Sequence, residues 1–359
     1  MSNVMDPKHV VIAEIPQTMQ RAIAEPLVGV RLEPTAVPAP GPGQLLVRTS
    51  LVGICGSDTH AVAGHHPFLN AAYVPGHEAT GVVVAAGSGT GRIPVGQRVL
   101  LKPNVACGAC VNCGAGRSNA CENLTWIGCD TSRHWSGAMA QFFVAPEANL
   151  YPVPDGIDDA TATLVECLAT PVHAARVAGD LTDARVVVLG AGTIGVLCVV
   201  AALNAGATHV VVTDMEQTKI DRAARVGARG GVIASTPDLE QQVRDLLDGP
   251  ADVVFDCVAN ERSLAQGMGL LRRAGTLLIV GVPPRPGSID LPLVQDWEIR
   301  IQGCAAYTES DVETSIRVAA AGGLPTGEIM SGTYPLNDLT SAFERAAADS
   351  SGKVMVSPS

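Results

Sequence analysis

The chain has 359 residues, of which 47% are hydrophobic and 16% are charged, and its formal net charge at pH 7 is -11. This length allows two domains at the usual size of about 100 to 200 residues each. The acidic balance and the lack of a Lys/Arg cluster argue against a nucleic-acid partner or an anionic membrane surface, because phosphate groups require concentrated cations. A small-molecule partner is the better expectation.

Residues 1–8 carry no basic segment followed by an apolar one, and no apolar run reaches the length of about 18 residues that a membrane span needs. We therefore expect a soluble, cytoplasmic protein with no membrane partner. The chain contains ten cysteines, and four of them crowd one glycine-rich segment. In a reducing compartment such clustering indicates a metal site rather than disulfides.

The first part of the chain consists of short strand signals separated by turns. Strands are predicted at 10–14, 28–32, 44–52 and 79–86, with Pro40-Gly41-Pro42-Gly43 among the turn signals. Few of these segments show the 3.6-residue period of a helix. The pattern predicts a partly barrel-shaped β domain with long functional loops.

From about Thr161 strand and helix signals alternate. Strands are predicted at 185–189, 209–213, 251–257, 276–281 and 297–304, and helices at 193–204, 217–226, 239–247 and 261–273. Such alternation is typical of an α/β fold and predicts a doubly wound parallel sheet of about six strands. Near residues 305–308 the chain is expected to return to the first domain, with helices at 311–321 and 336–347 and a strand at 353–357.

A glycine turn, Gly190-Ala191-Gly192-Thr193-Ile194-Gly195, follows one predicted strand and opens the next helix. Its first glycine allows the tight turn, the second lets the backbone approach a pyrophosphate, and the third lets helix and strand pack closely. The following strand ends at Asp214, 19 residues past Gly195, where a carboxylate accepts hydrogen bonds from the adenosine ribose and repels a 2′-phosphate. The pattern predicts an NAD site.

Two alternatives to NAD binding remain open. Lys219 and Arg222, on the next helix, could form a clamp for the 2′-phosphate of NADP, although solvated charges are ordinary on such a helix. The glycine turn could also belong to an α/β domain that binds no ligand. The position of Asp214 favours NAD binding over NADP binding and over a domain without a ligand.

Cys107, Cys110, Cys113 and Cys121 are spaced C-x2-C-x2-C-x7-C. Four thiolates close a tetrahedral shell with no vacant position, as a structural zinc requires. Iron-sulfur ligation is the alternative, but the x7 gap and the absence of Pro after Cys121 differ from the ferredoxin pattern. We expect a closed zinc lobe at about residues 103–124 with no catalytic role.

A second, open metal site is indicated by Cys55, which offers a thiolate, and His77, which offers an imidazole. A catalytic zinc usually has three protein ligands and one exchangeable position, so a third ligand is needed. The candidates for the third ligand are Asp58, Glu78, Glu166 and Cys167.

Several segments together resemble the zinc-dependent medium-chain alcohol dehydrogenase family. They are Gly53-Ile54-Cys55-Gly56-Ser57-Asp58-Thr59-His60, Pro75-Gly76-His77-Glu78, the cysteine cluster, the glycine turn and Val280-Gly281-Val282-Pro283-Pro284. The resemblance covers essentially the whole chain. Within the family, two features resemble the sorbitol and threonine dehydrogenase branch. One is the Cys-Gly-Ser-Asp-x-His form of the first segment, and the other is the segment Leu164-Val165-Glu166, which stands at the position of the third ligand.

The resemblance implies a GroES-like catalytic domain over 1–165 and 308–359, and a Rossmann coenzyme domain over 166–307. It implies Cys55, His77 and Glu166 as ligands of a catalytic zinc. Cys167 would need a register shift to reach the metal and is expected to be a small buried residue.

The resemblance also implies roles in the reaction. Glu78 is a carboxylate that swings onto the metal when water or product leaves. Ser57 accepts the alcohol proton and passes it through the coenzyme ribose towards His60 near the surface, where an imidazole can release it. Tyr307 could touch substrate, but a single aromatic residue is more often part of the packing.

The expected cofactors are NAD and two zinc ions per chain. The residues expected to contact NAD are Gly190, Gly192, Thr193, Ile194, Gly195, Asp214, Lys219 and Val282. The expected reaction is hydride transfer from a secondary alcohol, either a polyol or a sugar-like compound, to NAD, reversible with the ketone. Alternatives are a dehydrogenase of primary alcohols or aldehyde-linked substrates, and a non-catalytic sensor of NAD and zinc. The resemblance further implies a homodimer or homotetramer, and the predicted edge strand 297–304 suits self-pairing.

Overall fold

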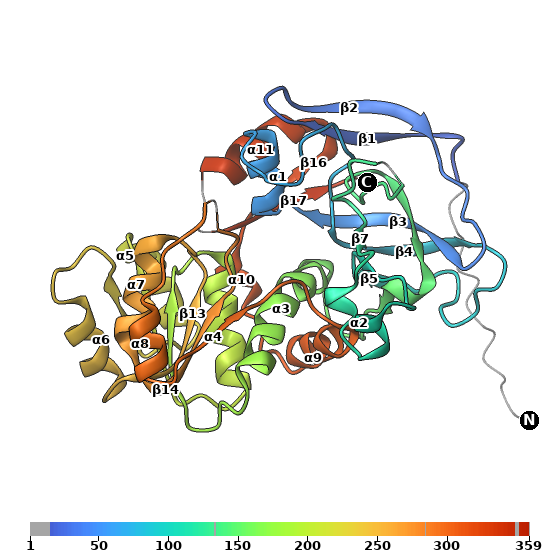
Figure 1. The fold of residues 1–359 in the computed structure, drawn as a ribbon. Helices are drawn as coiled ribbons and strands as arrows, with labels where there is room; N and C mark the ends of the chain where they lie inside the picture. Colours follow the sequence, from blue (N-terminus) through green and yellow to red (C-terminus); the bar gives the residue numbers. More distant parts are fainter. Residues whose placement is uncertain (1–14, 133, 284, 349–351, 359) are drawn as a thin grey trace, which may run out of the picture.

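The computed structural model describes residues 15–132, 134–283, 285–348 and 352–358. The strand predicted at 10–14 and Pro284 of the family resemblance lie outside these residues. The chain forms two halves, each built on a β-sheet, on either side of helix α3 (Asp159–Ala178) (Figure 1). Among the described residues, no helix has both the length and the apolar character needed to cross a bilayer.

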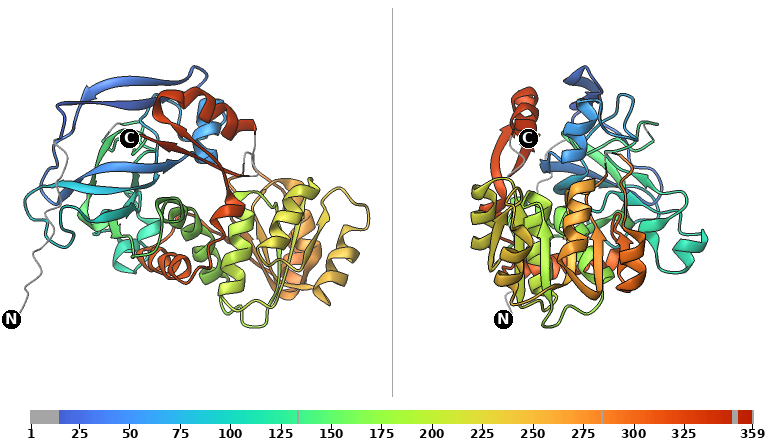
Figure 2. Two further views of the ribbon diagram at one scale, coloured as in Figure 1. Left: turned by 180° about the vertical axis from the view of Figure 1, so that it is seen from behind. Right: turned by 60° about the vertical axis from the view of Figure 1, so that its left-hand side comes forward.

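The first half contains a seven-stranded sheet that joins the early and late parts of the chain. Its strands lie in the order β16 (Met330–Pro335), β17 (Lys353–Ser357), β3 (Gln44–Gly53), β4 (Glu78–Ala86), β5 (Arg98–Leu101) and β9 (Leu150–Pro152), with β8 (Phe142–Pro146) also paired to β3. Figure 2 shows the late strands, in red, returning beside β3, in blue. A hairpin, β1 (Thr18–Glu25) and β2 (Gly29–Ala36), and a short pair, β6 (Asn104–Val105) and β7 (Thr125–Trp126), complete this half. The GroES-like, partly barrel-shaped β domain is confirmed.

The second half contains a six-stranded sheet in which every strand pair is parallel. Its order is β12 (Gly230–Ile233), β11 (His209–Asp214), β10 (Arg185–Leu189), β13 (Ala251–Asp256), β14 (Leu271–Ile279) and β15 (Arg300–Gly303). Side chains of a strand alternate between the two faces of a sheet. Accordingly Val186 and Val188 join one core cluster, whereas Val187 and Leu189 join another on the opposite face. The doubly wound parallel sheet is confirmed.

Helices cover both faces of this sheet. They are α4 (Thr193–Asn204), α5 (Gln217–Arg225), α6 (Leu239–Leu247), α7 (Glu261–Leu270) and α8 (Leu291–Asp296). The helix predicted at 261–273 is wrong at its end, because Leu271 is extended and pairs with Ala251 in the sheet. The strand predicted at 297–304 is shorter than expected, and β15, at the sheet edge, is preceded by the unpredicted helix α8.

Helix α3 contacts elements of both halves, among them β4 and α4. Asp158 begins it by accepting a hydrogen bond from the Thr161 backbone N–H at 2.7 Å. Most residues between Ala162 and Ala175 are buried, so the helix lacks a polar face. The domain boundary expected at 165/166 falls inside this helix. The remaining helices are α1 (Gly56–Val62), α2 (Val111–Gly114), α9 (Glu309–Ala320), α10 (Thr326–Ile329) and α11 (Leu339–Ala348), with short 3-10 turns η1 (Ser118–Ala120), η2 (Glu147–Asn149) and η3 (Leu336–Asp338).

A buried polar cluster joins α3 to α9. The carboxylate of Asp311 accepts hydrogen bonds from Arg176 Nε at 2.7 Å and from the Thr308 backbone N–H at 2.8 Å, and its Oδ2 lies 2.8 Å from Nδ1 of His173. Burial alone would raise the pKa of the Asp311 carboxyl, but the hydrogen bonds from His173, Arg176 and Thr308 outweigh it and hold the pKa well below its usual range. This cluster fixes the return of the chain from the six-stranded sheet to the first half.

Candidate active site

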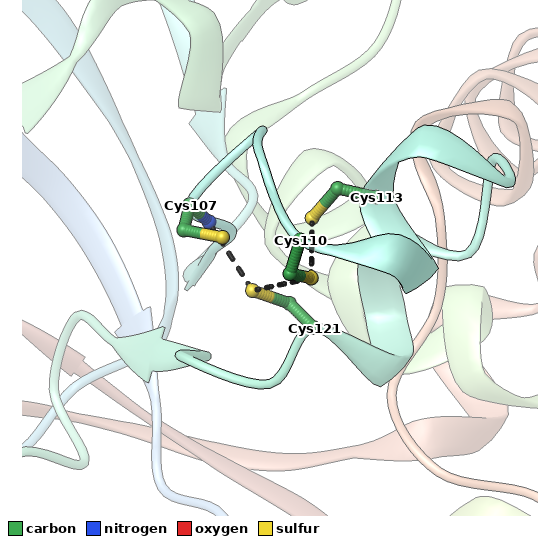
Figure 3. A group of neighbouring side chains, drawn as sticks. All are labelled: Cys107, Cys110, Cys113 and Cys121. Carbon is green, nitrogen blue, oxygen red and sulfur yellow. Dashed lines mark hydrogen bonds between the residues drawn. The ribbon is translucent and has the colours of Figure 1, made fainter.

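Four thiols converge in a small lobe on the surface of the first half, which we call the cysteine lobe (residues 104–126). The sulfur atoms of Cys107, Cys110, Cys113 and Cys121 all lie within 4.8 Å of one another (Figure 3). The Cys110 and Cys113 sulfurs are 3.5 Å apart, and those of Cys110 and Cys121 are 3.9 Å apart. Sulfurs that surround zinc tetrahedrally at about 2.3 Å are about 3.8 Å apart. The set therefore fits a four-thiolate zinc site.

The backbone of the lobe favours thiolates. The backbone N–H groups of Ala109 and Cys110 donate to the Cys107 sulfur and lower the pKa of its thiol to about 6. Burial acts in the opposite direction on Cys113 and raises the pKa of that thiol to about 12. A cation that holds several sulfurs at once favours the thiolate form of each of them.

A second donor group forms where β3, α1 and β4 meet. Cys55 immediately precedes α1, His77 precedes β4, and Glu78 is the first residue of that strand. One donor atom from each of these three residues lies within 4.8 Å of the other two. Thiolate, imidazole and carboxylate are the ligand types that zinc prefers. The described structure thus gathers Glu78, rather than Glu166, with Cys55 and His77.

The two oxygens of the Glu78 carboxylate differ in their surroundings. Oε1 accepts a hydrogen bond from Lys353 Nζ at 2.6 Å, and both side chains are buried. Burial raises the pKa of the Glu78 carboxyl, but Lys353 and other neighbours outweigh it, so that the pKa is lowered. Oε2 is buried and has no hydrogen-bond partner among the described residues. An unpaired anionic oxygen beside a thiol and an imidazole fits a bound cation.

Glu166 is a second buried carboxylate and lies close to Glu78. A donor atom of Glu166 lies within 4.8 Å of one from Glu78 and one from Cys167. Its Oε1 accepts a hydrogen bond from the hydroxyl of Tyr307, which is 1% exposed. Burial raises the pKa of the Glu166 carboxyl to about 7, and the Glu78 charge acts in the same direction. Cys167 is buried beside this pair, as expected of a small packing residue, and the role of Glu166 as a zinc ligand stays a prediction.

His77 also lies close to Cys129, which the sequence did not indicate, and to Asp58, which was one of the candidate third ligands. Nδ1 of His77 lies 3.2 Å from the sulfur of Cys129, in a loop more than 50 positions away. Asp58 is completely buried beside them and accepts hydrogen bonds from the Cys55 backbone N–H at 3.1 Å and the Tyr73 hydroxyl at 2.9 Å. Contacts of this kind fix the orientation of a ligand imidazole. The sequence signal for Cys129 is a lone cysteine, which predicts nothing.

Ser57 and His60 lie on α1, which the sequence did not predict as a helix. The Ser57 hydroxyl oxygen is buried and has no hydrogen-bond partner among the described residues. His60 lies three positions later and is exposed. A hydroxyl without a partner can accept a proton from a bound alcohol, and an exposed imidazole can exchange it with water. Their relay role stays a prediction.

The glycine turn has the geometry of a dinucleotide site. Gly190 has a φ of 88°, which a larger residue adopts only with strain, and a Cβ on Gly195 would lie 1.8 Å from the Gly190 carbonyl oxygen. Asp214 Oδ2 accepts a hydrogen bond from the Ala191 backbone N–H at 2.8 Å. Gly192 is the N-cap of α4, so Thr193 and Ile194 form its first turn, whose N–H groups favour an anion.

The interpretation of Lys219 and Arg222 as ordinary solvated charges is wrong. Both are buried, and both have polar partners: Lys219 pairs with Glu216 at 2.9 Å, and Arg222 donates to the Ala191 carbonyl oxygen at 2.7 Å. Arg222 therefore supports the glycine turn directly. Val282, expected to contact the coenzyme, is exposed.

Two family models match this chain. The alcohol dehydrogenase GroES-like domain matches residues 41–155, and the zinc-binding dehydrogenase model matches residues 193–321. The sorbitol dehydrogenase of Bacillus subtilis is 28% identical over 96% of this chain and 98% of its own length. The L-threonine 3-dehydrogenase of Chromobacterium violaceum is 30% identical over 94% of this chain and 99% of its own length.

A solved structure shows the same similarity. It is a zinc-binding dehydrogenase from Sinorhizobium meliloti bound to NADP, with 30% identity and a TM-score of 0.88 over 96% of this chain and 100% of that one. The chain belongs to the zinc-dependent medium-chain alcohol dehydrogenase family, in the branch of the sorbitol and threonine dehydrogenases.

Proposed function

We propose that this protein is a zinc-dependent dehydrogenase that transfers a hydride from a secondary alcohol, either a polyol or a sugar-like compound, to NAD, and that also reduces the ketone. The observation that carries this proposal is the group of Cys55, His77 and Glu78, in which the imidazole and the carboxylate are buried and one carboxylate oxygen has no hydrogen-bond partner among the described residues. The unpartnered hydroxyl of Ser57 lies on the adjoining helix α1. A zinc ion held there would supply Lewis acidity, and NAD would supply the hydride acceptor.

The residues of the chain supply the remaining parts of the reaction. Ser57 accepts the proton of the bound alcohol, and His60 delivers it to solvent from its exposed position on α1. Glu166 is the third zinc ligand that we propose, and Glu78 is the carboxylate that exchanges with water or product. Lys353 leaves Oε2 of Glu78 available for that exchange, because it occupies only Oε1.

We assign the coenzyme to the part of the chain between residues 166 and 307, and the catalytic domain to residues 1–165 and 308–359. The pyrophosphate would lie against the first turn of α4, with Gly190, Gly192, Gly195 and the backbone of Thr193 and Ile194 around it.

Asp214 supports NAD over NADP, because its carboxylate stands at the end of β11 and would repel a 2′-phosphate. The two cations considered for a 2′-phosphate are both engaged, because Lys219 is paired with Glu216 and Arg222 donates to the Ala191 carbonyl oxygen. Asp214→Ala should raise KM for NAD about tenfold or more and narrow the preference over NADP, because a hydrogen bond to a charged group contributes about 1.5 to 3 kcal/mol. Unchanged kinetics with both coenzymes would exclude this assignment.

Coenzyme reduction at 340 nm, measured with a panel of polyols, hydroxy-amino acids, and simple primary and secondary alcohols, tests the proposed reaction. Chelation should abolish turnover of the preferred secondary alcohol, and zinc should restore it. A preference for primary alcohols would favour the alternative substrate class. Full zinc and tight NAD binding without turnover of any alcohol would favour a non-catalytic sensor.

We also propose that the protein forms a homodimer or homotetramer and acts in the cytoplasm on a small-molecule substrate. The edge strand β15 supports association, because it can pair with the same strand of a second copy. Light scattering gives the number of copies.

A further inference from the structure

The cysteine lobe contacts a segment of the chain that leads towards the active site. Ser118 Oγ donates to Glu309 Oε2 at 2.7 Å, and Asn119 Nδ2 donates to the Ala305 carbonyl oxygen at 3.0 Å. Asn119 Nδ2 also lies 3.3 Å from Nε2 of His173, in the buried polar cluster of α3. The lobe therefore holds both the chain that precedes α9 and the first residue of that helix.

The same segment is held from two further positions in the lobe. Asn104 Nδ2 donates to the Tyr307 carbonyl oxygen at 2.8 Å. The ring of Trp126 meets the ring of Tyr307 edge to face, with centroids 6.4 Å apart and an interplanar angle of 88°. Ala306, between these contacts, has a φ of 55°, which an alanine adopts only where its surroundings impose it. The backbone at Tyr307 is thus fixed by the lobe.

Tyr307 connects this segment to the candidate metal ligands. Its side chain is buried, and its hydroxyl donates to Glu166 Oε1. Glu166 in turn lies beside Glu78. A contact that orients a ligand carboxylate usually affects metal affinity and turnover.

We propose that the cysteine lobe, through Asn119 and the segment 305–309, positions the Tyr307 hydroxyl on Glu166, so that the lobe sets the geometry of the catalytic carboxylate. This inference rests on the proposed function in assigning Glu166 to the catalytic zinc. It differs from the expectation that the lobe has no part in catalysis. Asn119 and Tyr307 are positioning residues, because each acts through another residue.

The decisive experiment is a double-mutant cycle of Asn119→Asp and Tyr307→Phe in the zinc-loaded protein. Asn119→Asp keeps the shape of the side chain but removes the amide group that contacts Ala305 and His173, and it adds a negative charge, as Asn112→Asp does. Tyr307→Phe should lower kcat about tenfold, as the loss of other contacts to metal ligands does. Asn119→Asp should lower kcat about threefold to tenfold, because Asn119 acts on the ligand only through Tyr307. In the Tyr307→Phe protein, Asn119→Asp should change kcat by less than about twofold, because the link is already broken. Effects that multiply would overturn the proposal.

Asn112 provides a matched control within the lobe. Its amide donates to the Ala120 carbonyl at 2.8 Å and its oxygen accepts from Arg117, so its contacts stay inside the lobe. Asn112→Asp also loses one amide donor, but should leave kcat within about twofold of the wild type. A decrease as large as that of Asn119→Asp would mean that loosening the lobe suffices, and would overturn the specific link.

Zinc release to a chelator measures the same link without turnover. A Cys55→Ser/His77→Ala protein lacks both the thiolate and the imidazole of the catalytic donor set and supplies the release rate of the lobe alone. The rest of the zinc release comes from the catalytic site, and Asn119→Asp should speed that phase about threefold or more. In the Tyr307→Phe protein, the same substitution should leave the rate of that phase unchanged. An unchanged rate would contradict the proposal. If the wild type oxidises no alcohol, the proposed function fails, whereas this zinc-release cycle still decides whether the lobe acts on the site.

Discussion

Lys353→Met removes the cation from the buried ion pair beside the candidate catalytic metal. Lys353 Nζ lies 2.6 Å from Glu78 Oε1 and donates to the Ile54 carbonyl oxygen at 3.2 Å. Lys353 and Glu78 are 5% and 2% exposed, so water cannot replace the lost cation without rearrangement. Methionine occupies a similar volume, and the main change is therefore an uncompensated buried carboxylate.

Breaking such a pair from one side costs about 3 to 5 kcal/mol. For 359 residues the entropy of unfolding is about 0.75 kcal/mol per kelvin, at about 2.1 cal/mol per kelvin per residue. The melting temperature of the metal-free protein should therefore fall by about 5 °C. The decrease should be smaller in the zinc-loaded protein, because a bound cation near Glu78 replaces part of the lost attraction.

Thermal unfolding followed by calorimetry measures this loss. The double variant Glu78→Gln/Lys353→Met should recover more than half of it, since no buried charge is left unpaired. The control is Arg225→Met, which removes the cation of an exposed pair with Glu328 at 2.9 Å and should cost less than about 1 kcal/mol. A double variant no more stable than Lys353→Met would show that the loss of stability does not come from the unpaired Glu78 carboxylate.

Three further outcomes are expected. Asp311→Asn should destabilise the fold by about 3 kcal/mol at pH 7 in urea unfolding, because charge-assisted hydrogen bonds are lost. The folded-state pKa of Asp311 lies below its unfolded value of about 3.9, so this stabilisation is present above about pH 4 and is lost as the pH falls through the folded-state pKa. A stability difference between wild type and Asp311→Asn that grows on acidification would contradict this pH dependence. Ser57→Ala should lower kcat about a hundredfold with coenzyme affinity unchanged, and intact turnover would end the relay hypothesis. Cys113→Ser should reduce bound zinc from about two ions per chain to about one by atomic absorption, and retention of both would contradict the four-thiolate site.

Features with a local sequence signal were predictable. Strand β10, helix α4 and the glycine turn occupy the predicted residues because one short segment carries strand, turn and helix signals in order. The four lobe cysteines lie within 15 positions, so their convergence needs no knowledge of the fold. Cys55 and His77 were paired from their ligand types before the family resemblance was considered, although their spacing alone predicts no contact.

Other features depend on contacts that leave no local pattern. Cys129 approaches His77 from a distant loop, and Lys353 reaches Glu78 from a strand near the other end of the chain. Helix α3 was not anticipated because it is apolar on nearly every side and so has no amphipathic period. The burial of Arg222 depends on the position of the glycine turn, which composition does not encode.

The contact between Lys353 and Glu78 also sets an order of events in the cell. The two residues are 275 positions apart, and β17, which carries the lysine, must pair with β3 beside Cys55. At a synthesis rate of about 5 to 20 residues per second, Glu78 leaves the ribosome about 14 to 55 s before its partner. During that interval the carboxylate lacks its cation and the thiol lacks its neighbouring strand. We expect ribosome-bound chains that end before β17 to take up zinc in the cysteine lobe but not at the catalytic donors, so that loading of the reactive metal follows translation.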